Sequence, residues 1–149
     1  MPTYNSQDDA VVNLDDTGGS LADVSDYVKE VMLDHESNIG RFAVLGQRYE
    51  KTTEGTSRAK GTLTVYQSVD AAGAHYLITH WLMNSTTNKA GLKSLRIQTP
   101  DAAAGSFQFD CEIRPASYNE VVTSAGEGNP GEHQLSFEVD GAVTWSVIS

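Results

Sequence analysis

Hydrophobic and polar residues alternate along most of this chain, which is the pattern of β-strands that bury one face. In the clearest run, 105–115, inward positions hold Phe107, Phe109, Cys111 and Ile113, and outward positions hold Gln108, Asp110, Glu112 and Arg114. Shorter strand candidates lie at 10–14, 28–36, 58–67, 92–97, 118–123, 134–139 and 142–148. The pattern therefore predicts about eight short strands.

One segment, 70–84, departs from the alternation because its apolar residues recur at helical spacing. Its apolar stripe consists of Ala74, Leu77, Ile78, Trp81 and Leu82. Residues spaced i, i+3, i+4, i+7 and i+8 share one face of a helix. Ser68 or Asp70 can cap its start. We interpret Leu77, Ile78, Trp81 and Leu82 as the core side of a helix that closes an open face of the strands.

Turn-forming residues separate the predicted strands. Clusters of Asp, Gly, Asn and Pro lie at 15–19 and 126–131, and the pair Asp140-Gly141 is typical of a two-residue hairpin. A single helical turn is expected within 21–28, and residues 1–9 are interpreted as a flexible N-terminus. With no βαβ rhythm and no internal repeat, residues 1–149 are expected to form one domain. The predicted fold is a mainly β antiparallel sandwich or barrel with one helix on an open side.

Residues 37–57 show no clean periodicity and are expected to form a long loop. Loops of this length are usually disordered or functional, and this one is too apolar for a disordered linker. Two interpretations stay open, an extended arm that docks on a neighbouring molecule, with a hairpin as one form, or an arm folded back on its own core. The candidate arm residues are Arg41, Phe42, Leu45, Arg48, Tyr49 and Lys51.

Charge is segregated along the chain, whose formal net charge is -10. Residues 1–36 contain nine acids and one base, and residues 101–149 contain eight acids and one base. Residues 37–100 instead contain eight bases and three acids. Such complementary regions favour head-to-tail self-association, although chance segregation on a solvated surface is the competing explanation. The acidic balance argues against a nucleic-acid-binding surface, which needs Lys and Arg.

No catalytic, cofactor or metal site is predicted. Gly126-Glu-Gly-Asn-Pro-Gly131 matches a dinucleotide-binding fingerprint by letter, but a strand follows it where the fingerprint needs a helix. His75 and His80 lie about 140° apart around a helix, so they cannot share a metal ion. His35 and His133 have no partner motif. We therefore expect a protein that is not an enzyme.

The single cysteine, Cys111, falls at an inward strand position and is expected to be an inert buried thiol. One cysteine excludes an intrachain disulfide, and the first residues lack the pattern of a signal peptide. No run has the length of a transmembrane helix. These observations predict a protein of a reducing cytoplasm, without contact with a membrane.

The order of these features resembles the major tail tube proteins of long-tailed bacteriophages. The resemblance covers mainly the first two-thirds of the chain. It rests on Asp15-Asp-Thr-Gly-Gly19, Asp23-Val-Ser-Asp-Tyr-Val28, Phe42, Gly46, Arg48 and Gly61-Thr-Leu-Thr-Val65, followed by a helix and a closing hairpin. The Thr-Thr-Phe-Gly version of the family's long loop is absent here.

The resemblance implies a virion protein that forms hexameric rings, stacked into a hollow tube that conducts viral DNA. Implied partners are other copies of itself and the tape-measure, tail-tip and terminator proteins, with DNA only in transit. The implied location is the virion tail, assembled in the bacterial host cytoplasm. The arm would dock on an acidic partner surface that includes Asp15 and Asp16. Asp110 and Glu112 are lumen candidates, or else part of an ordinary solvated strand face.

Two alternative functions stay open at this point. Within the same class of particle, the chain could be a tail-terminator or neck ring protein. From another class, a carbohydrate-binding β-sandwich would need aromatic residues on a flat face, for which Tyr66, Tyr118 and Trp145 are available.

Overall fold

The computed structural model describes residues 9–16, 18–83, 91–120 and 131–149. Their elements are β1 (Val11–Asp15), β2 (Leu21–Asp23), the 3-10 turn η1 (Ser25–Tyr27), β3 (Val28–Phe42), β4 (Lys51–Tyr66), α1 (Ala74–Met83), β5 (Lys93–Thr99), β6 (Phe107–Asn119) and β7 (Glu132–Val147). The predicted mainly β architecture with one helix is confirmed, and η1 occupies the place of the expected helical turn. No helix in the described ranges has the length and apolar character needed to cross a membrane.

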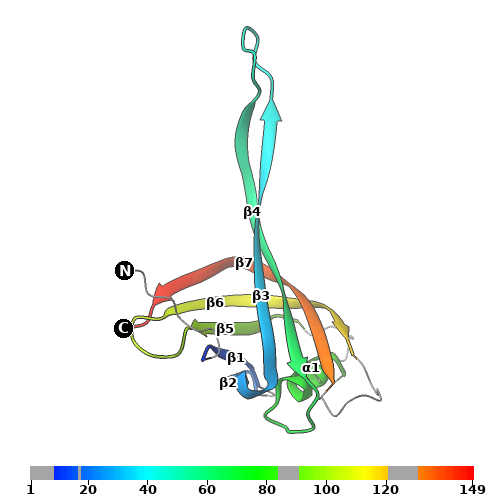
Figure 1. Ribbon diagram of the computed structural model, residues 1–149. Helices are drawn as coiled ribbons and strands as arrows, with labels where there is room; N and C mark the ends of the chain where they lie inside the picture. The colour runs from blue at the N-terminus through cyan, green and yellow to red at the C-terminus, as the bar shows by residue number, and fades with distance from the viewer. Residues whose placement is uncertain (1–8, 17, 84–90, 121–130) are drawn as a thin grey trace.

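The seven strands form one antiparallel sheet in the order β2-β1-β5-β6-β7-β4-β3 (Figure 1). Neighbours in this order are not always neighbours in sequence, since β1 pairs with β5 and β4 pairs with β7. Alternate residues of the paired strands share one buried face. The fully buried side chains on this face include Leu14, Leu63, Leu95, Ile113, Leu135 and Phe137.

The helix α1 packs against this buried face. Leu77, Ile78 and Trp81 are buried, and Leu82 is half-buried against the same core. The helix begins at Ala74 rather than near Asp70, because the backbone first makes a turn in which Gly73 N–H donates to the Asp70 carbonyl oxygen at 2.9 Å. The Asp70 carboxylate accepts a hydrogen bond from the Tyr27 hydroxyl at 3.0 Å. The apolar stripe is therefore the side of α1 that meets the sheet.

Residues 37–57 correct the expectation of a long loop. They belong mostly to β3 and β4, whose pairing continues from His35 opposite Ala59 to Phe42 opposite Lys51. The connection between these strands is only 43–50. Nearly all side chains in 37–57 are exposed, because both faces of this hairpin meet solvent. A strand pair without a buried face has no reason to alternate apolar and polar residues, so it lacks the pattern used to predict strands.

The predicted hairpin at Asp140-Gly141 is wrong, because β7 runs through this pair without reversing (Figure 1). The register opposite β6 shifts here, from Glu112 opposite Asp140 to Asp110 opposite Thr144. Gly141 has a φ of 83°. A positive φ at glycine suits a β-bulge as well as a tight turn. The predicted strand at 118–123 likewise begins as the end of β6, while 121–123 and the turn 126–131 lie outside the described residues.

Candidate assembly interface

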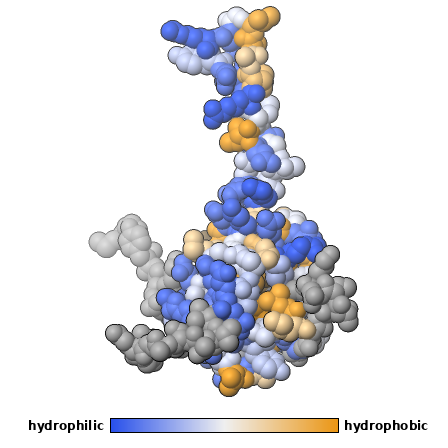
Figure 2. Space-filling model, turned by 90° about the vertical axis from the view of Figure 1, so that its right-hand side faces the viewer, coloured by the Kyte–Doolittle hydropathy of each residue, from blue (hydrophilic) through white to orange (hydrophobic). Residues whose placement is uncertain are grey.

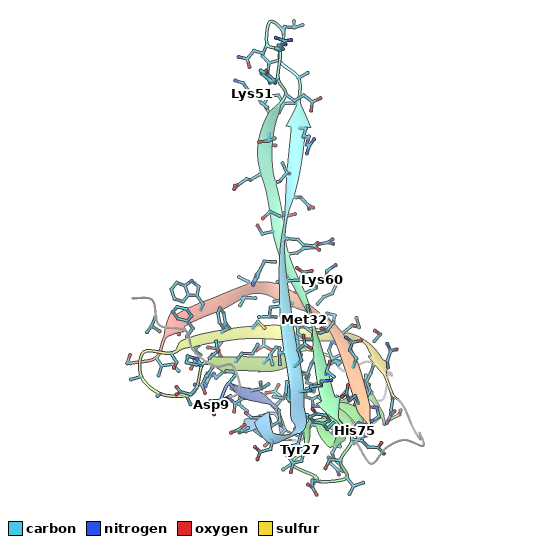
Figure 3. All side chains as sticks on the ribbon, viewed as in Figure 1. Asp9, Tyr27, Met32, Lys51, Lys60 and His75 are labelled. Atoms are coloured by element: carbon cyan, nitrogen blue, oxygen red, sulfur yellow. The ribbon has the colours of Figure 1, made fainter. Side chains whose placement is uncertain are left out.

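The most prominent feature of the molecule is the hairpin stalk, residues 35–42 of β3 with 51–59 of β4. It extends beyond the sheet because β4 pairs with β7 only from Lys60 onward (Figures 1 and 3). Polar side chains link its two strands, with Ser37 Oγ 3.1 Å from Ser57 Oγ and Asn38 Nδ2 donating to Thr56 Oγ1 at 3.2 Å. The stalk is therefore held by backbone pairing and polar cross-strand contacts instead of by a core.

A small charge network lies where the stalk leaves the sheet. Glu36 pairs with Arg58 at 2.8 Å and with Lys60 at 3.2 Å. The hydrogen bond from Arg58, followed by that from Lys60, lowers the pKa of Glu36. Exposed pairs such as these contribute little to stability, and the single carboxylate of Glu36 balances the charge of only one of the two cations. Within the described ranges, no ion pair engages the cations Arg41, Arg48 and Lys51 farther out.

The far end of the hairpin, residues 41–51, is called the hairpin tip. It brings together all six candidate arm residues, which lie on the strand ends and connection of a hairpin and not on a long loop. Leu45 has a relative exposure of 101% and Tyr49 of 79%, while Phe42 is 45% exposed. Figure 2 shows hydrophobic and hydrophilic residues on opposite sides of the tip. An arm folded back on its own core is contradicted, because the tip stands clear of the sheet.

Asp110 and Glu112 lie on the sheet face that points away from α1. Arg96 Nε donates to Asp110 Oδ1 at 2.7 Å, and Ser94 Oγ donates to Glu112 Oε1 at 2.7 Å. These four residues contribute to the lining of an open groove over β5, β6 and β7. The sequence did not reveal the Arg96–Asp110 pair, since it depends on the register between β5 and β6. This face is thus polar and rich in carboxylates, with Arg96 paired to Asp110 and Arg114 exposed farther along β6.

Asp15 and Asp16 are engaged within the subunit. Asp15 is buried, and its carboxylate accepts the Ser94 N–H at 2.9 Å. Asp16 Oδ1 accepts the N–H groups of Gly18 and Ser20 at 2.8 and 3.0 Å, as expected in a turn. Their role as an acidic partner surface stays a prediction, and both carboxylates already serve the local fold.

A second apolar surface was missed by sequence reasoning. Phe107, Trp145 and Val147 continue the inward face of β6 and β7, yet they are 49%, 61% and 51% exposed. The rings of Phe107 and Trp145 meet edge to face with centroids 5.5 Å apart, and Phe109 adjoins Phe107 at 6.5 Å. These four residues are called the aromatic end. The sequence did contain a signal for this surface. The inward apolar positions of 107–109 and 145–147 extend the apolar face beyond the area that one short helix can cover.

A polar cluster lies where α1 meets β6 and β7, at the other end of these strands from the aromatic end. It consists of His75, Tyr118, Glu120 and His133. His75 Nδ1 lies 2.6 Å from Tyr118 Oη, and His75 Nε2 lies 3.4 Å from Glu120 Oε1. The rings of His75 and His133 stack with centroids 4.3 Å apart. Burial and the neighbouring His75 lower the pKa of His133, and burial raises that of Tyr118. In the described part of the chain, no group of three or more His, Cys, Asp and Glu could hold a metal ion.

The remaining sequence candidates do not form a site. Burial raises the pKa of Cys111 to about 11, so its thiol stays protonated. The three aromatics considered for carbohydrate binding are dispersed. Tyr118 hydrogen-bonds His75, Tyr66 pairs opposite Glu132 at the beginning of β7, and Trp145 lies near the end of that strand. They therefore make no shared flat face.

No protein-family model and no curated protein matches this sequence. Solved structures do resemble it over almost the whole chain. A chain in the tail of an empty GTA particle with C6 symmetry has a TM-score of 0.67 and 10% identity, covering 97% of this chain and 99% of that one. A chain of the SPP1 tail tube has a TM-score of 0.71 and 12% identity, covering 98% of this chain and 81% of that one. A chain in the tube terminating cap of the anti-feeding prophage has a TM-score of 0.73 and 16% identity, covering 99% of this chain and 93% of that one. This chain shares their fold.

Proposed function

We propose that this chain is the tail tube subunit of a bacteriophage or bacteriophage-like particle. Copies form hexameric rings, and rings stack into a hollow tube that conducts DNA. The observation that carries the proposal is the hairpin tip, an apolar and cationic surface on a stalk with no core of its own. Such a surface gains stability only by contact with another molecule.

The fold supports this assignment. Chains of the same fold occur in a tail with C6 symmetry and in a tail tube. A contact between one surface of a subunit and a different surface of the next is heterologous, and repetition of such a contact builds a ring or a filament. A projecting hairpin on one end of a subunit is suited to contacts of this kind.

The charge distribution fits passage of DNA without binding. Each copy has a formal net charge of -10, so a ring of six carries about sixty negative charges. The polar face with Asp110 and Glu112 is our candidate for the lumen. Its carboxylates repel the phosphates of DNA, whereas free cations in that place would bind them. Arg96 on that face is paired with Asp110, and the exposed Arg114 lies opposite Glu138 of β7. We place the protein in the virion tail, assembled in the host cytoplasm beside tape-measure, tail-tip and terminator proteins, with no catalytic role.

The test is assembly of the purified protein, followed by electron microscopy and sedimentation over a range of concentrations. In the test variant, Asn-Gly replaces residues 41–52. Since Gly40 pairs opposite Thr53, the shortened strands still meet across a two-residue turn. Wild type should form tubes, whereas the variant should keep its circular dichroism spectrum and form no tubes. A wild-type protein that stays monomeric at every concentration contradicts the proposal.

A point variant with a matched control separates the tip from general surface hydrophobicity. Leu45→Asp places a charge at the tip, and Val69→Asp places the same charge at another exposed aliphatic residue, 91% exposed and outside the hairpin. We expect Leu45→Asp to prevent stacking and Val69→Asp to leave it intact. Equal effects of the two variants would mean that the tip has no special role.

A terminator function is the second candidate, favoured by the likeness to a chain in a tube terminating cap. A terminator ends a tube, so its rings should not stack on one another. Wild-type protein that forms single rings at high concentration, with the hairpin intact, would support this candidate over the tube subunit.

A further inference from the structure

Among the residues that the structure describes, none covers the aromatic end fully, since Phe107, Trp145 and Val147 are about half exposed. Its residues point to the same side of the sheet as the core, but α1 packs on the opposite end of β6 and β7 (Figure 1). On β7, Leu135 and Phe137 are buried while Trp145 is 61% exposed, so the covered part of the strand ends between them. Apolar side chains that are exposed together in one patch, as these are, mark sites of interaction with another molecule.

The turn that precedes Phe107, beside the aromatic end, carries one carboxylate, that of Asp101. The turn 101–106 is joined to the end of β7, since Ile148 N–H donates to the Ser106 carbonyl oxygen at 2.9 Å. Within this turn, Asp101 Oδ1 accepts the Ala103 N–H at 2.9 Å and the Ser106 hydroxyl at 2.8 Å. These hydrogen bonds, the Ala103 one first, lower the pKa of Asp101 and keep its carboxylate charged. A partner with apolar and cationic groups suits such a surface.

We propose that the aromatic end of one copy receives the hairpin tip of the next copy. This inference rests on the proposed tail tube function and names the surface that the tip binds. The tip supplies Phe42, Leu45 and Tyr49 for burial against Phe107, Trp145 and Val147. Its unpaired cations, Arg41 and Arg48, suit the Trp145 ring, the best partner for a cation–π contact, and the Asp101 carboxylate.

The placement of the two surfaces favours contact between copies. The stalk leaves the sheet from β3 and β4 at one edge, whereas the aromatic end lies at the ends of β6 and β7, near the C-terminus (Figure 1). The two surfaces are thus different parts of one subunit. Joining them makes a heterologous contact, which propagates along a stack of rings.

The size of the contact is consistent with assembly by repetition. A standard stable interface buries ~800 Å² on each partner. One tip has too few side chains to bury an area of that size. A single tip should therefore bind weakly. Six tips that engage at once between two rings gain strongly from effective concentration. Stacking then depends on rings, as a tube requires.

Disulfide trapping between two variants tests the contact. In a Cys111→Ala background, one preparation carries Leu45→Cys and the other carries Val147→Cys. We expect tubes formed from a mixture of the two to yield a linked dimer on mild oxidation. Each preparation alone should yield little, because tip does not meet tip and aromatic end does not meet aromatic end. The matched control pairs Leu45→Cys with Val69→Cys, which should give no dimer.

A second variant keeps the inference falsifiable if trapping disturbs assembly. Trp145→Glu alters an exposed residue, so the fold and the rings should persist. Tubes should then need at least about tenfold more protein, the equivalent of about 1.4 kcal/mol for stacking. Combining Asp101→Lys with Arg48→Glu should restore stacking lost in Asp101→Lys alone, as expected for two charges that face each other.

The outcomes separate this inference from the proposed function. Wild-type tubes without a Leu45–Val147 dimer would overturn the inference and leave the tube function standing. Loss of the rings themselves in Trp145→Glu would place the aromatic end between neighbours within one ring, which also overturns it. Absence of any wild-type assembly would overturn both.

Discussion

His133 shows how burial changes the chemistry of a single side chain. It is 1% exposed and stacks on His75, and its neighbours include Tyr118 on β6, Glu120 beyond it and Val65 on β4. Burial, and then the nearby His75, lower its pKa, while Glu120 partly opposes this. The unfolded chain therefore takes up a proton more readily than the folded one. By linkage, stability is complete above the unfolded pKa of about 6.5 and is lost as pH falls through the folded value.

This linkage predicts a loss of thermal stability between pH 7.5 and pH 5. The carboxylates with lowered pKa, those of Glu36 and Asp101, lose their contributions only below about pH 4.5, so the histidine dominates the higher window. His133→Phe keeps a ring for stacking and cannot be protonated. Its melting temperature, followed by circular dichroism, should vary less with pH over this range than that of wild type. An equal dependence in both proteins would assign the effect to other groups.

At the scale of the element, α1 was the easiest part to predict and the hairpin stalk the hardest. The helix has a one-sided apolar stripe because one side meets the sheet, and burial imposes that pattern. In the stalk, Thr52, Thr53 and Thr56 favour strands, but no buried face forces alternation. The Asp140-Gly141 pair wrongly predicted a hairpin, because a glycine with positive φ occurs in a β-bulge as well as in a tight turn.

The packing of α1 predicts a large effect of truncating its tryptophan. Trp81 is 4% exposed in the core, with the Lys93 ammonium 5.7 Å from its ring centroid. Trp81→Ala should lower the free energy of unfolding by about 3–5 kcal/mol, from lost burial and the cavity left behind. Urea denaturation measures this difference. Met83→Ala in the same helix removes a side chain that is 71% exposed and should change stability by less than about 0.5 kcal/mol.

At the scale of the whole molecule, sequence could predict the class of fold but not its strand order. Inward positions such as Leu95, Ile113 and Leu135 follow from alternation alone. The pairing of β1 with β5 and of β4 with β7 joins segments far apart in sequence, and nothing local specifies it. The same limit applies to the candidate interface. The six tip residues were found by composition, whereas the aromatic end depends on where α1 stops covering the sheet.

Strand order also decides which charges meet passing DNA, and this gives a prediction for the assembled tube. If the polar face of β5, β6 and β7 lines the channel, Glu112→Lys places a cation from every copy along it. Such tubes should cosediment with a short DNA duplex at low salt and release it at high salt, because binding exchanges counterions for lysine–phosphate contacts. Asp26→Lys makes the same charge change on η1, away from that face. Tubes of the control and of wild type should leave the duplex in solution. Equal binding by both lysine variants would mean that general charge, and not the lining of the channel, attracts DNA.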